Sequence, residues 1–289
     1  MLNDRIMPLD EVGPEYLDRG TFFGDGVYEV LRSYNGRLFA LEEHFARLER
    51  SLEAIEIPVL SGPVPSEVEG VEGTGVKIGE IRSRVLGAFE KAGIANAKIY
   101  FHITRGSGLR DHLPEKDMKP NFFLTVMELK DNPKLKNEGV SVSTYPDIRW
   151  KRCDIKSLNL LANVLARADS AKKSCWEAIF VNDDGLITEG AGSAFFGIVD
   201  GKLRTSPLNA NILPSVTRKY VIKAAANVGL KVDEESLTTV EARIAAELFL
   251  GVTTRDIIPV VKFDGQTIGD GNPGKMTKQL IEEFKKFTK

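Results

Sequence analysis

A polar segment, KDNPKLKNEG at residues 130–139, separates two stretches of the chain that each mix strand and helix patterns. Boundaries between domains commonly fall in such polar, proline-bearing linkers, where few contacts cross. The 289 residues are enough for one large domain or two ordinary ones. We therefore expect an α/β protein with a small N-terminal α/β domain (1–129), an interdomain linker (130–139) and a larger C-terminal α/β domain (140–289).

The N-terminal part begins with clear local signals. A strand pattern at 27–34 meets Asn35-Gly36, which is typical of a tight β-hairpin turn. Apolar residues at helical spacing predict helices over 41–54 and 78–92. Residues 61–75, SGPVPSEVEGVEGTG, are rich in Pro, Gly and Glu, so we expect a surface excursion there.

The C-terminal part contains RCDIKSLNLLANVLARA at 152–168, which places Lys156 between a strand pattern and a helix pattern. From Leu158 onward, leucines recur every three to four residues and predict one wide apolar helix face. Lysines in irregular links next to buried elements can serve as nucleophilic amines. The residues alone favour the commoner alternative, a solvated surface lysine.

Charge and cysteine usage exclude several classes of function. The net charge is −2, from 39 basic and 41 acidic residues, which gives no reason to expect nucleic acid or a membrane surface as partner. The start, MLNDRIMPLDEV, lacks the basic and apolar regions of a signal peptide. Cys153 and Cys175 have no metal-ligand spacing, so we expect no metal and a reducing cytoplasm.

Three features beyond Lys156 suit one cofactor. Glu189 precedes two small residues in LITEGAG, Pro214-Ser215 opens a helix whose N–H groups favour a phosphate, and Thr253 lies in a turn after an apolar strand. Pyridoxal phosphate needs a lysine for its aldehyde, an acid for its ring nitrogen and N–H donors for its phosphate. Many α/β proteins have a turn glutamate and a capped helix, so spacing alone leaves the cofactor open.

Several motifs, in order, resemble the class IV aminotransferases of fold type IV, and most of all the D-amino acid aminotransferases. The similarity runs from about Asn3 to the C-terminal helix, with its main departure at 61–75. It implies the architecture of that fold and pyridoxal 5'-phosphate as cofactor. The motifs are DRGTFFGDGVYEV, EEHFARL, IYFHITRGSGLRDHLPE, DIRWKRCDIKSLNLL, LITEGAGSAFFGI, ILPSVTR and TTVEARIAAELFLGVTT.

The resemblance assigns roles residue by residue. It implies that Lys156 is the catalytic Schiff-base lysine and that Glu189 holds the pyridine nitrogen. It further implies an arginine, a helix-start pair and a threonine on the phosphate, and a leucine behind the ring. These are, in that order, Arg47, Val216 with Thr217, Thr253, and Leu213. Without the resemblance, Arg47 would be taken as a surface charge of its helix.

The same resemblance implies how the substrate carboxylate is held. A tyrosine and an R-x-H pair from the partner subunit grip it in D-amino acid aminotransferases, and the matching positions are Tyr28, Arg110 and His112. We therefore expect a homodimer with its active site at the subunit interface. The expected substrates are amino acids and 2-oxo acids, with D-alanine and 2-oxoglutarate giving pyruvate and D-glutamate.

Alternatives remain within and outside this activity. A branched-chain L-amino acid aminotransferase or an (R)-amine transaminase shares everything except the carboxylate clamp. An aminodeoxychorismate lyase uses the same fold for elimination, and a non-catalytic dimeric binding protein is the alternative from another class. Two positions depart from the close relatives: Gly192 and Val252 stand where those carry serines, so side-chain hydrogen bonds there are in doubt.

Overall fold

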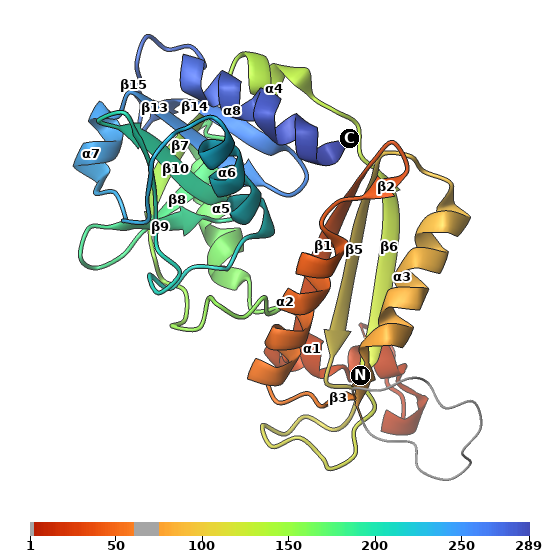
Figure 1. Cartoon of the computed structure of the whole chain (residues 1–289). Helices are drawn as coiled ribbons and strands as arrows, with labels where there is room; N and C mark the ends of the chain where they lie inside the picture. Colours follow the sequence, from red (N-terminus) through yellow and green to blue (C-terminus); the bar gives the residue numbers. More distant parts are fainter. Residues whose placement is uncertain (1–2, 61–74) are drawn as a thin grey trace. The chain divides into compact units, whose positions relative to one another are not determined.

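The computed structural model describes residues 3–60 and 75–289, so the excursion expected at 61–75 lies almost wholly outside the described residues. The chain divides into two compact units (Figure 1). Unit 1 consists of Met1–Leu31, Leu41–Glu128 and Ile155–Leu160; unit 2 consists of Arg32–Ala40, Leu129–Asp154 and Leu161–Lys289. Neither unit is one continuous stretch, in contrast to the contiguous parts expected from the sequence.

The described part of unit 1 contains a β-sheet, a short parallel pair of strands (β3 with β4) and three α-helices. The sheet order is β2-β1-β5-β6, and the last residues of β1 together with β2 belong to unit 2. In β1, Val27, Glu29 and Leu31 alternate as fully buried residues, which places them on the covered face of the sheet. The elements are α1 (Arg19–Phe23), β1 (Gly26–Tyr34), β2 (Arg37–Leu38), α2 (Leu41–Ala54), β3 (Val59–Leu60), β4 (Val76–Lys77), α3 (Ile78–Ala92), β5 (Ala97–Thr104) and β6 (Asn121–Glu128).

Unit 2 is a larger sheet of order β12-β11-β10-β13-β14-β7-β8-β9, with β15 beside β14. Strand β7 pairs in parallel with β8 and β14, whereas β10, β13 and β14 pair antiparallel. The strands are β7 (Val140–Pro146), β8 (Glu177–Val181), β9 (Ile187–Gly190), β10 (Ala194–Val199), β11 (Lys202–Thr205), β12 (Val232–Asp233), β13 (Glu247–Val252), β14 (Asp256–Phe263) and β15 (Gln266–Thr267). The helices are α4 (Pro133–Asn137), α5 (Leu161–Lys172), α6 (Val216–Asn227), α7 (Thr239–Ile244) and α8 (Lys275–Lys285).

Both faces of the unit 2 sheet are covered. Phe196 belongs to a core cluster with residues of α6 and α8, and its neighbour Phe195 belongs to a second cluster with Leu237 and α7. Successive side chains of a strand point to opposite faces, so β10 is apolar on both sides. The strands therefore form a rigid platform on which the loops at their ends are held.

Helix α5 differs from its expected packing. It begins at Leu161 rather than near Leu158, and it rests on the sheet through Ala166 and Ser170. The predicted apolar face is not buried within the chain, because Leu161 is 68% and Leu165 47% exposed. The periodicity predicted a helix correctly but could not tell what covers its apolar side. In the described part of the chain, none of the helices has the length and apolar character to cross a membrane.

Candidate active site

Lys156 lies in unit 1, on the irregular segment that runs beside β1. Its carbonyl accepts the Tyr28 N–H at 2.9 Å, and its own N–H donates to the Ser51 hydroxyl of α2 at 3.2 Å. The ammonium Nζ lies 4.1 Å from the centre of the Tyr28 ring. The side chain is half-buried and has no carboxylate partner among the described residues. Its backbone is thus fixed by a strand and a helix while its amine stays available.

Arg47 of α2 is buried in the same unit, at 4% exposure. Its Nε and Nη2 donate to the two carboxylate oxygens of Glu29 at 2.7 and 2.8 Å, and Glu29 also contacts His44 Nδ1 at 2.8 Å. The alternative of a surface charge on the helix is therefore wrong for Arg47. Sequence reasoning missed Glu29, although a charged residue between buried Val27 and Leu31 is a usable signal.

Nearby charges keep the buried Glu29 carboxylate ionised. Burial raises the pKa of Glu29, but the charge and hydrogen bonds of Arg47, helped by His44, bring that pKa well below its usual range. Burial lowers the pKa of His44, and the hydrogen bond and charge of Glu29 offset part of that effect. At neutral pH the guanidinium of Arg47 is consequently held in place by a carboxylate rather than by water.

Tyr28 faces away from this buried network. Strand alternation puts it on the opposite face of β1, where it lies 5.9 Å between ring centres from Tyr100. The Tyr100 hydroxyl is 3.0 Å from Nδ1 of His102 on the same strand. These side chains are partly exposed, so this face of the sheet carries aromatic and hydroxyl groups open to a ligand.

The loop that carries Arg110 and His112 is held through its backbone. The buried Arg19 donates from Nη1 to the Asp111 carbonyl at 2.6 Å and from Nη2 to the His112 carbonyl at 3.0 Å. Arg110 and His112 themselves are exposed, and their side chains lie 5.2 and 5.3 Å from the ring centre of Phe23. Within the described residues of one chain, no hydrogen bond, ion pair or ring contact joins either of them to Tyr28.

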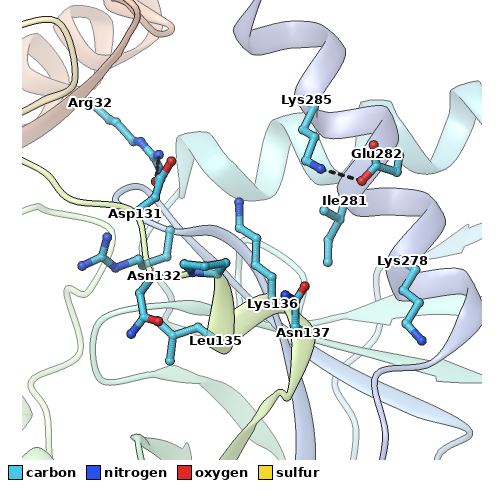
Figure 2. Close-up of a pocket in the computed structure, with 12 residues that line it drawn as sticks. Arg32, Asp131, Asn132, Leu135, Lys136, Asn137, Lys278, Ile281, Glu282 and Lys285 are labelled. Carbon is cyan, nitrogen blue, oxygen red and sulfur yellow. Dashed lines mark hydrogen bonds and ion pairs between the residues drawn. The ribbon is translucent and has the colours of Figure 1, made fainter.

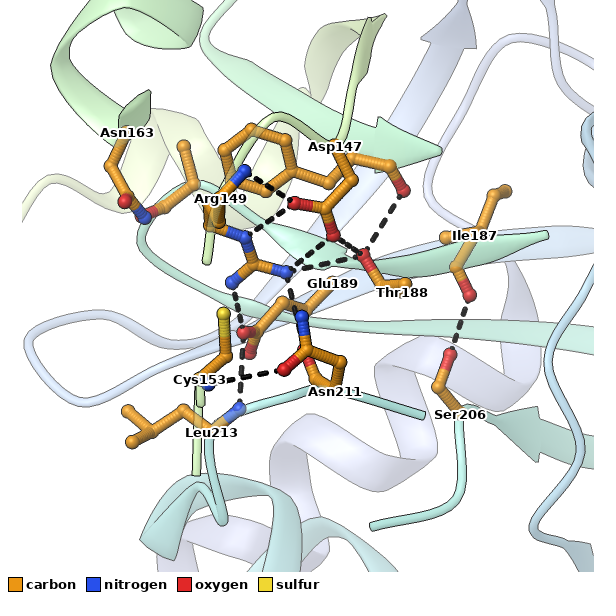
Figure 3. Close-up of polar contacts among 12 residues, drawn as sticks. Asp147, Arg149, Cys153, Asn163, Ile187, Thr188, Glu189, Ser206, Asn211 and Leu213 are labelled. Atoms are coloured by element: carbon orange, nitrogen blue, oxygen red, sulfur yellow. Dashed lines mark hydrogen bonds and ion pairs between the residues drawn. The ribbon is translucent and has the colours of Figure 1, made fainter. Parts of the chain in front are cut away.

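Glu189 lies in unit 2, in a buried cluster at the end of β9. Its Oε1 accepts hydrogen bonds from Arg149 Nη1 at 2.5 Å and from the Leu213 N–H at 3.0 Å (Figure 3). Arg149 also pairs with Asp147 through Nε and Nη2, at 2.9 and 2.8 Å. The Thr188 hydroxyl donates to Asp147 at 2.8 Å. Two sequence-predicted residues, Glu189 and Leu213, are thus joined directly.

The charges of this cluster shift the pKa values of Asp147 and Arg149. Burial raises the pKa of Asp147, but the hydrogen bonds and charge of Arg149 bring it below its usual value. Burial lowers the pKa of Arg149, yet its carboxylate partners Asp147 and Glu189 raise it on balance. Sequence reasoning missed Asp147 and Arg149, whose only signal is two charges beside Ile148 and Trp150 in a strand-end loop.

The start of α6 supplies unpaired backbone donors. Ser215 is the N-cap, and its hydroxyl accepts the Arg218 N–H at 3.2 Å, as expected for a helix opened by Pro214-Ser215. The N–H groups of Val216 and Thr217, in the first turn, have no intrahelical acceptor. Thr217 is buried, and a Cβ built on Gly251 would lie 3.4 Å from its methyl group. The helix start and the turn after β13, which carries Thr253, therefore lie side by side.

Of the two positions where the resemblance leads us to expect serine, Gly192 has room for a side chain. A Cβ at Gly192 would meet only Glu177, at 3.6 Å, and the Gly192 N–H already donates to that carboxylate at 3.2 Å. Val252 pairs with Asp256 at the end of the β13–β14 ladder. Among the described residues, no group of three or more His, Cys, Asp or Glu side chains is arranged to hold a metal ion.

Comparisons with known proteins find similar sequences over nearly the whole chain. The family model described as "Amino-transferase class IV" matches residues 26–263. A D-alanine aminotransferase of Staphylococcus haemolyticus is 36% identical over 99% of this chain and 96% of its own length. One from Bacillus licheniformis is 36% identical over 97% of this chain and 93% of its own length.

Solved structures share the fold at lower identity. A branched-chain amino acid aminotransferase from Escherichia coli has a TM-score of 0.79 at 23% identity, covering 96% of this chain and 90% of its own. The enzyme of the same name from Thermoproteus uzoniensis, with norvaline, has a TM-score of 0.80 at 24% identity, covering 98% and 91%. These neighbours establish the fold type IV architecture.

Proposed function

The chain belongs to the class IV aminotransferases, and from that premise we propose that it moves amino groups between D-amino acids and 2-oxo acids. The observation that carries the proposal is the near full-length match to D-alanine aminotransferases at 35–37% identity. We expect D-alanine and 2-oxoglutarate to give pyruvate and D-glutamate. The branched-chain alternative is supported only by fold neighbours at 23–24% identity, so it ranks second.

The donor groups of the chain fit pyridoxal 5'-phosphate. When bound, this cofactor supplies an aldehyde for the amino group and a ring that withdraws electrons from the substrate. Glu189, paired with Arg149, suits the protonated ring nitrogen, and Leu213 is held next to it. The N–H groups of Val216 and Thr217 suit the phosphate, with Thr253 beside them and Arg47 as a further cationic group.

Lys156 has two tasks in this proposal. Its amine holds the cofactor between turnovers, and during turnover it moves a proton at the substrate Cα. The backbone bonds to Tyr28 and Ser51 fix where the side chain starts, so the amine works from one side. Because the proton is delivered from one side, the enantiomer of the product depends on which side of the pocket grips the substrate carboxylate.

Tyr28, Arg110 and His112 are proposed to grip the substrate carboxylate. Arg110 and His112 are exposed and make no contact with Tyr28 in the described chain, which suits a loop that serves the neighbouring subunit. The exposed leucine face of α5, with Ile148 and Trp150 at 55% and 40% exposure, supports a homodimer. With Cys153 and Cys175 as free thiols, the proposal assigns the enzyme to the reducing cytoplasm.

The deciding experiment is a half-reaction with single amino donors. D-alanine should convert the cofactor absorbance of the purified enzyme to that of the amine form, whereas L-leucine should not. Lys156→Ala should lower the rate by about 10²–10⁴-fold, the usual contribution of a positioned acid–base group. Faster conversion by L-leucine would favour the branched-chain activity, and pyruvate formed without any amino acceptor would favour the lyase.

A mixing experiment tests the shared site. Arg110→Ala should raise the KM for D-alanine and 2-oxoglutarate together, because both present a carboxylate to the same group. Mixed dimers of Arg110→Ala and Lys156→Ala chains should regain activity at one of their two sites. Inactive mixtures that demonstrably contain heterodimers would assign the clamp to its own subunit.

A further inference from the structure

Unit 2 contains a cavity of about 510 Å³ that none of the expected site residues line. Its walls are α4, α8, Arg32 at the beginning of the unit and Arg255 after β13 (Figure 2). Ligand pockets of proteins typically measure about 300–1,000 Å³. The cavity is therefore large enough for a small organic molecule.

The lining is predominantly cationic. Five basic side chains face two acidic ones, Asp131 and Glu282; the basic ones are Arg32, Lys136, Arg255, Lys278 and Lys285. In Figure 2 the Lys136 ammonium extends from α4 into the space between Arg32 and Lys285. Clustered charges of one sign in a concave site raise the local concentration of opposite ions.

Part of this charge is not neutralised by the protein. Asp256, behind the wall, accepts from Lys136 at 2.6 Å and from Arg32 at 3.0 Å, and Asp131 accepts from Arg32 at 2.7 Å. Lys278 has no ion-pair partner among the described residues. Within the same part of the chain, the Arg255 guanidinium has only the Lys130 carbonyl as acceptor, at 2.8 Å. These two cations remain for an anion that enters the cavity.

Apolar groups share the wall with the cations. Pro133 and Leu135 of α4 lie opposite Ile281 of α8, and Ile281 is buried. A simple inorganic ion would leave this surface wet, whereas an organic body of a few carbon atoms would cover it. We propose that the cavity binds a small organic dianion, either a dicarboxylate or a phosphate ester, with an apolar body.

Arg32 connects this site to the turn that carries Thr253. Its Nη1 donates to the Thr254 carbonyl at 2.9 Å as well as to Asp256, whose backbone has a positive φ of 61°. An anion that accepts hydrogen bonds from Arg32 competes with the Thr254 carbonyl and Asp256. It therefore changes the free energy needed to keep the turn in its observed conformation. The coupling rests on the proposed role of Thr253 toward the cofactor phosphate. The ligand should alter cofactor affinity, and the cofactor should alter ligand affinity by the same factor.

The test is calorimetry on the holoenzyme with phthalate, phenyl phosphate and neutral benzyl alcohol. None of the three has an amino or oxo group to transaminate, and no turnover is needed. We expect binding of at least one anion at millimolar concentration, weakened by salt, and no binding of benzyl alcohol. Preference for phthalate or phenyl phosphate identifies the dicarboxylate or the phosphate ester as the natural class.

Matched variants locate the binding. Lys278→Glu should weaken it by roughly three- to tenfold, because a partly exposed ionic attraction is replaced by a repulsion. Lys275→Glu, on the same helix but outside the cavity, should change it little. Asn137→Trp, which fills the cavity, should abolish it, while Arg110→Ala should not.

The proposal is overturned by the absence of binding of either anion, or by unchanged binding in both Lys278→Glu and Asn137→Trp. Binding that Arg110→Ala abolishes and Asn137→Trp leaves intact also overturns it, because the anion then occupies the carboxylate clamp. Cofactor affinity that stays constant at saturating ligand overturns the coupling to the turn. Because calorimetry needs no catalysis, a failure of D-alanine to react leaves this test intact.

Discussion

Helices α2 and α5 invert the usual relation between side-chain polarity and burial. Helix α2 buries a guanidinium and an imidazole at 4% and 1% exposure, whereas α5 leaves Leu161 and Val164 exposed at 68% and 60%. In α2 the partner is within the chain, because Glu29 on β1 satisfies both Arg47 and His44. In α5 the described chain provides no cover. Whether a side chain is buried depends on the partner that is available to it. For α2 that partner is a carboxylate in the same unit, and for α5 we propose a second subunit.

The largest expected effect comes from a substitution that disrupts the buried ion pair between α2 and β1. Glu29→Gln removes the carboxylate charge that pairs with the buried Arg47 guanidinium, which should lower the free energy of unfolding by about 3–5 kcal/mol. Urea unfolding measures it. The control is Glu42→Gln, which breaks the exposed ion pair between Glu42 of α2 and Arg82 and should change the free energy of unfolding little.

The same pair allows a second step. Replacing both partners, with Glu29→Gln and Arg47→Met together, removes the uncompensated charge and should recover much of the lost stability. The double variant should still bind pyridoxal phosphate more weakly, because one charge-assisted contact is worth about 1.5–3 kcal/mol. Equal cofactor affinity in wild type and double variant would contradict the proposed phosphate role of Arg47.

An intermediate effect is expected on the α5 side. Leu161→Glu with Leu165→Glu places charges on the exposed face, so the dimer should dissociate at least about tenfold more readily. The unfolding free energy of the dissociated subunit should change little, since exposed substitutions usually stay within about 0.5 kcal/mol. Sedimentation across a concentration series measures the dissociation of the dimer. Urea unfolding of dilute protein measures the unfolding free energy of the dissociated subunit. An unchanged dimer would mean that this face is simply solvated.

The smallest effect concerns pH. Because burial lowers the pKa of His44, the unfolded chain gains a proton at that residue below about pH 6.5 that the folded chain resists. The unfolding free energy should therefore fall as the pH drops from about 7 to 5.5, and His44→Gln should flatten that fall. His112→Gln, at an exposed position, is the control. A slope unchanged by His44→Gln would exclude this contribution.

Local signals predicted the elements well, and contacts distant in sequence escaped prediction. The bounds expected for α2 and α3 agree with the structure, and Asn35-Gly36 forms the turn between β1 and β2. These depend on spacing within about fifteen residues. The Asp147–Arg149–Glu189 cluster depends on two segments about 40 residues apart, and nothing in either marks the other. The sequence of α5 likewise contains no signal that tells whether its apolar side is covered within the chain.

The assignment of β1 to both units has a consequence for any attempt to dissect the gene. The backbone passes from one unit to the other at residues 31/32, 40/41, 128/129, 154/155 and 160/161, so a cut within 130–139 falls inside unit 2 and leaves three of these passages in one fragment and two in the other. A fragment ending there lacks 155–160, whose backbone pairs with Gly26 and Tyr28, and it carries 32–40 without the core of Phe249 and Phe284 on which Phe39 packs. Neither half should be expressible alone as a folded protein. Recombination that exchanges one unit between relatives would need several crossovers. The two units should therefore be inherited together.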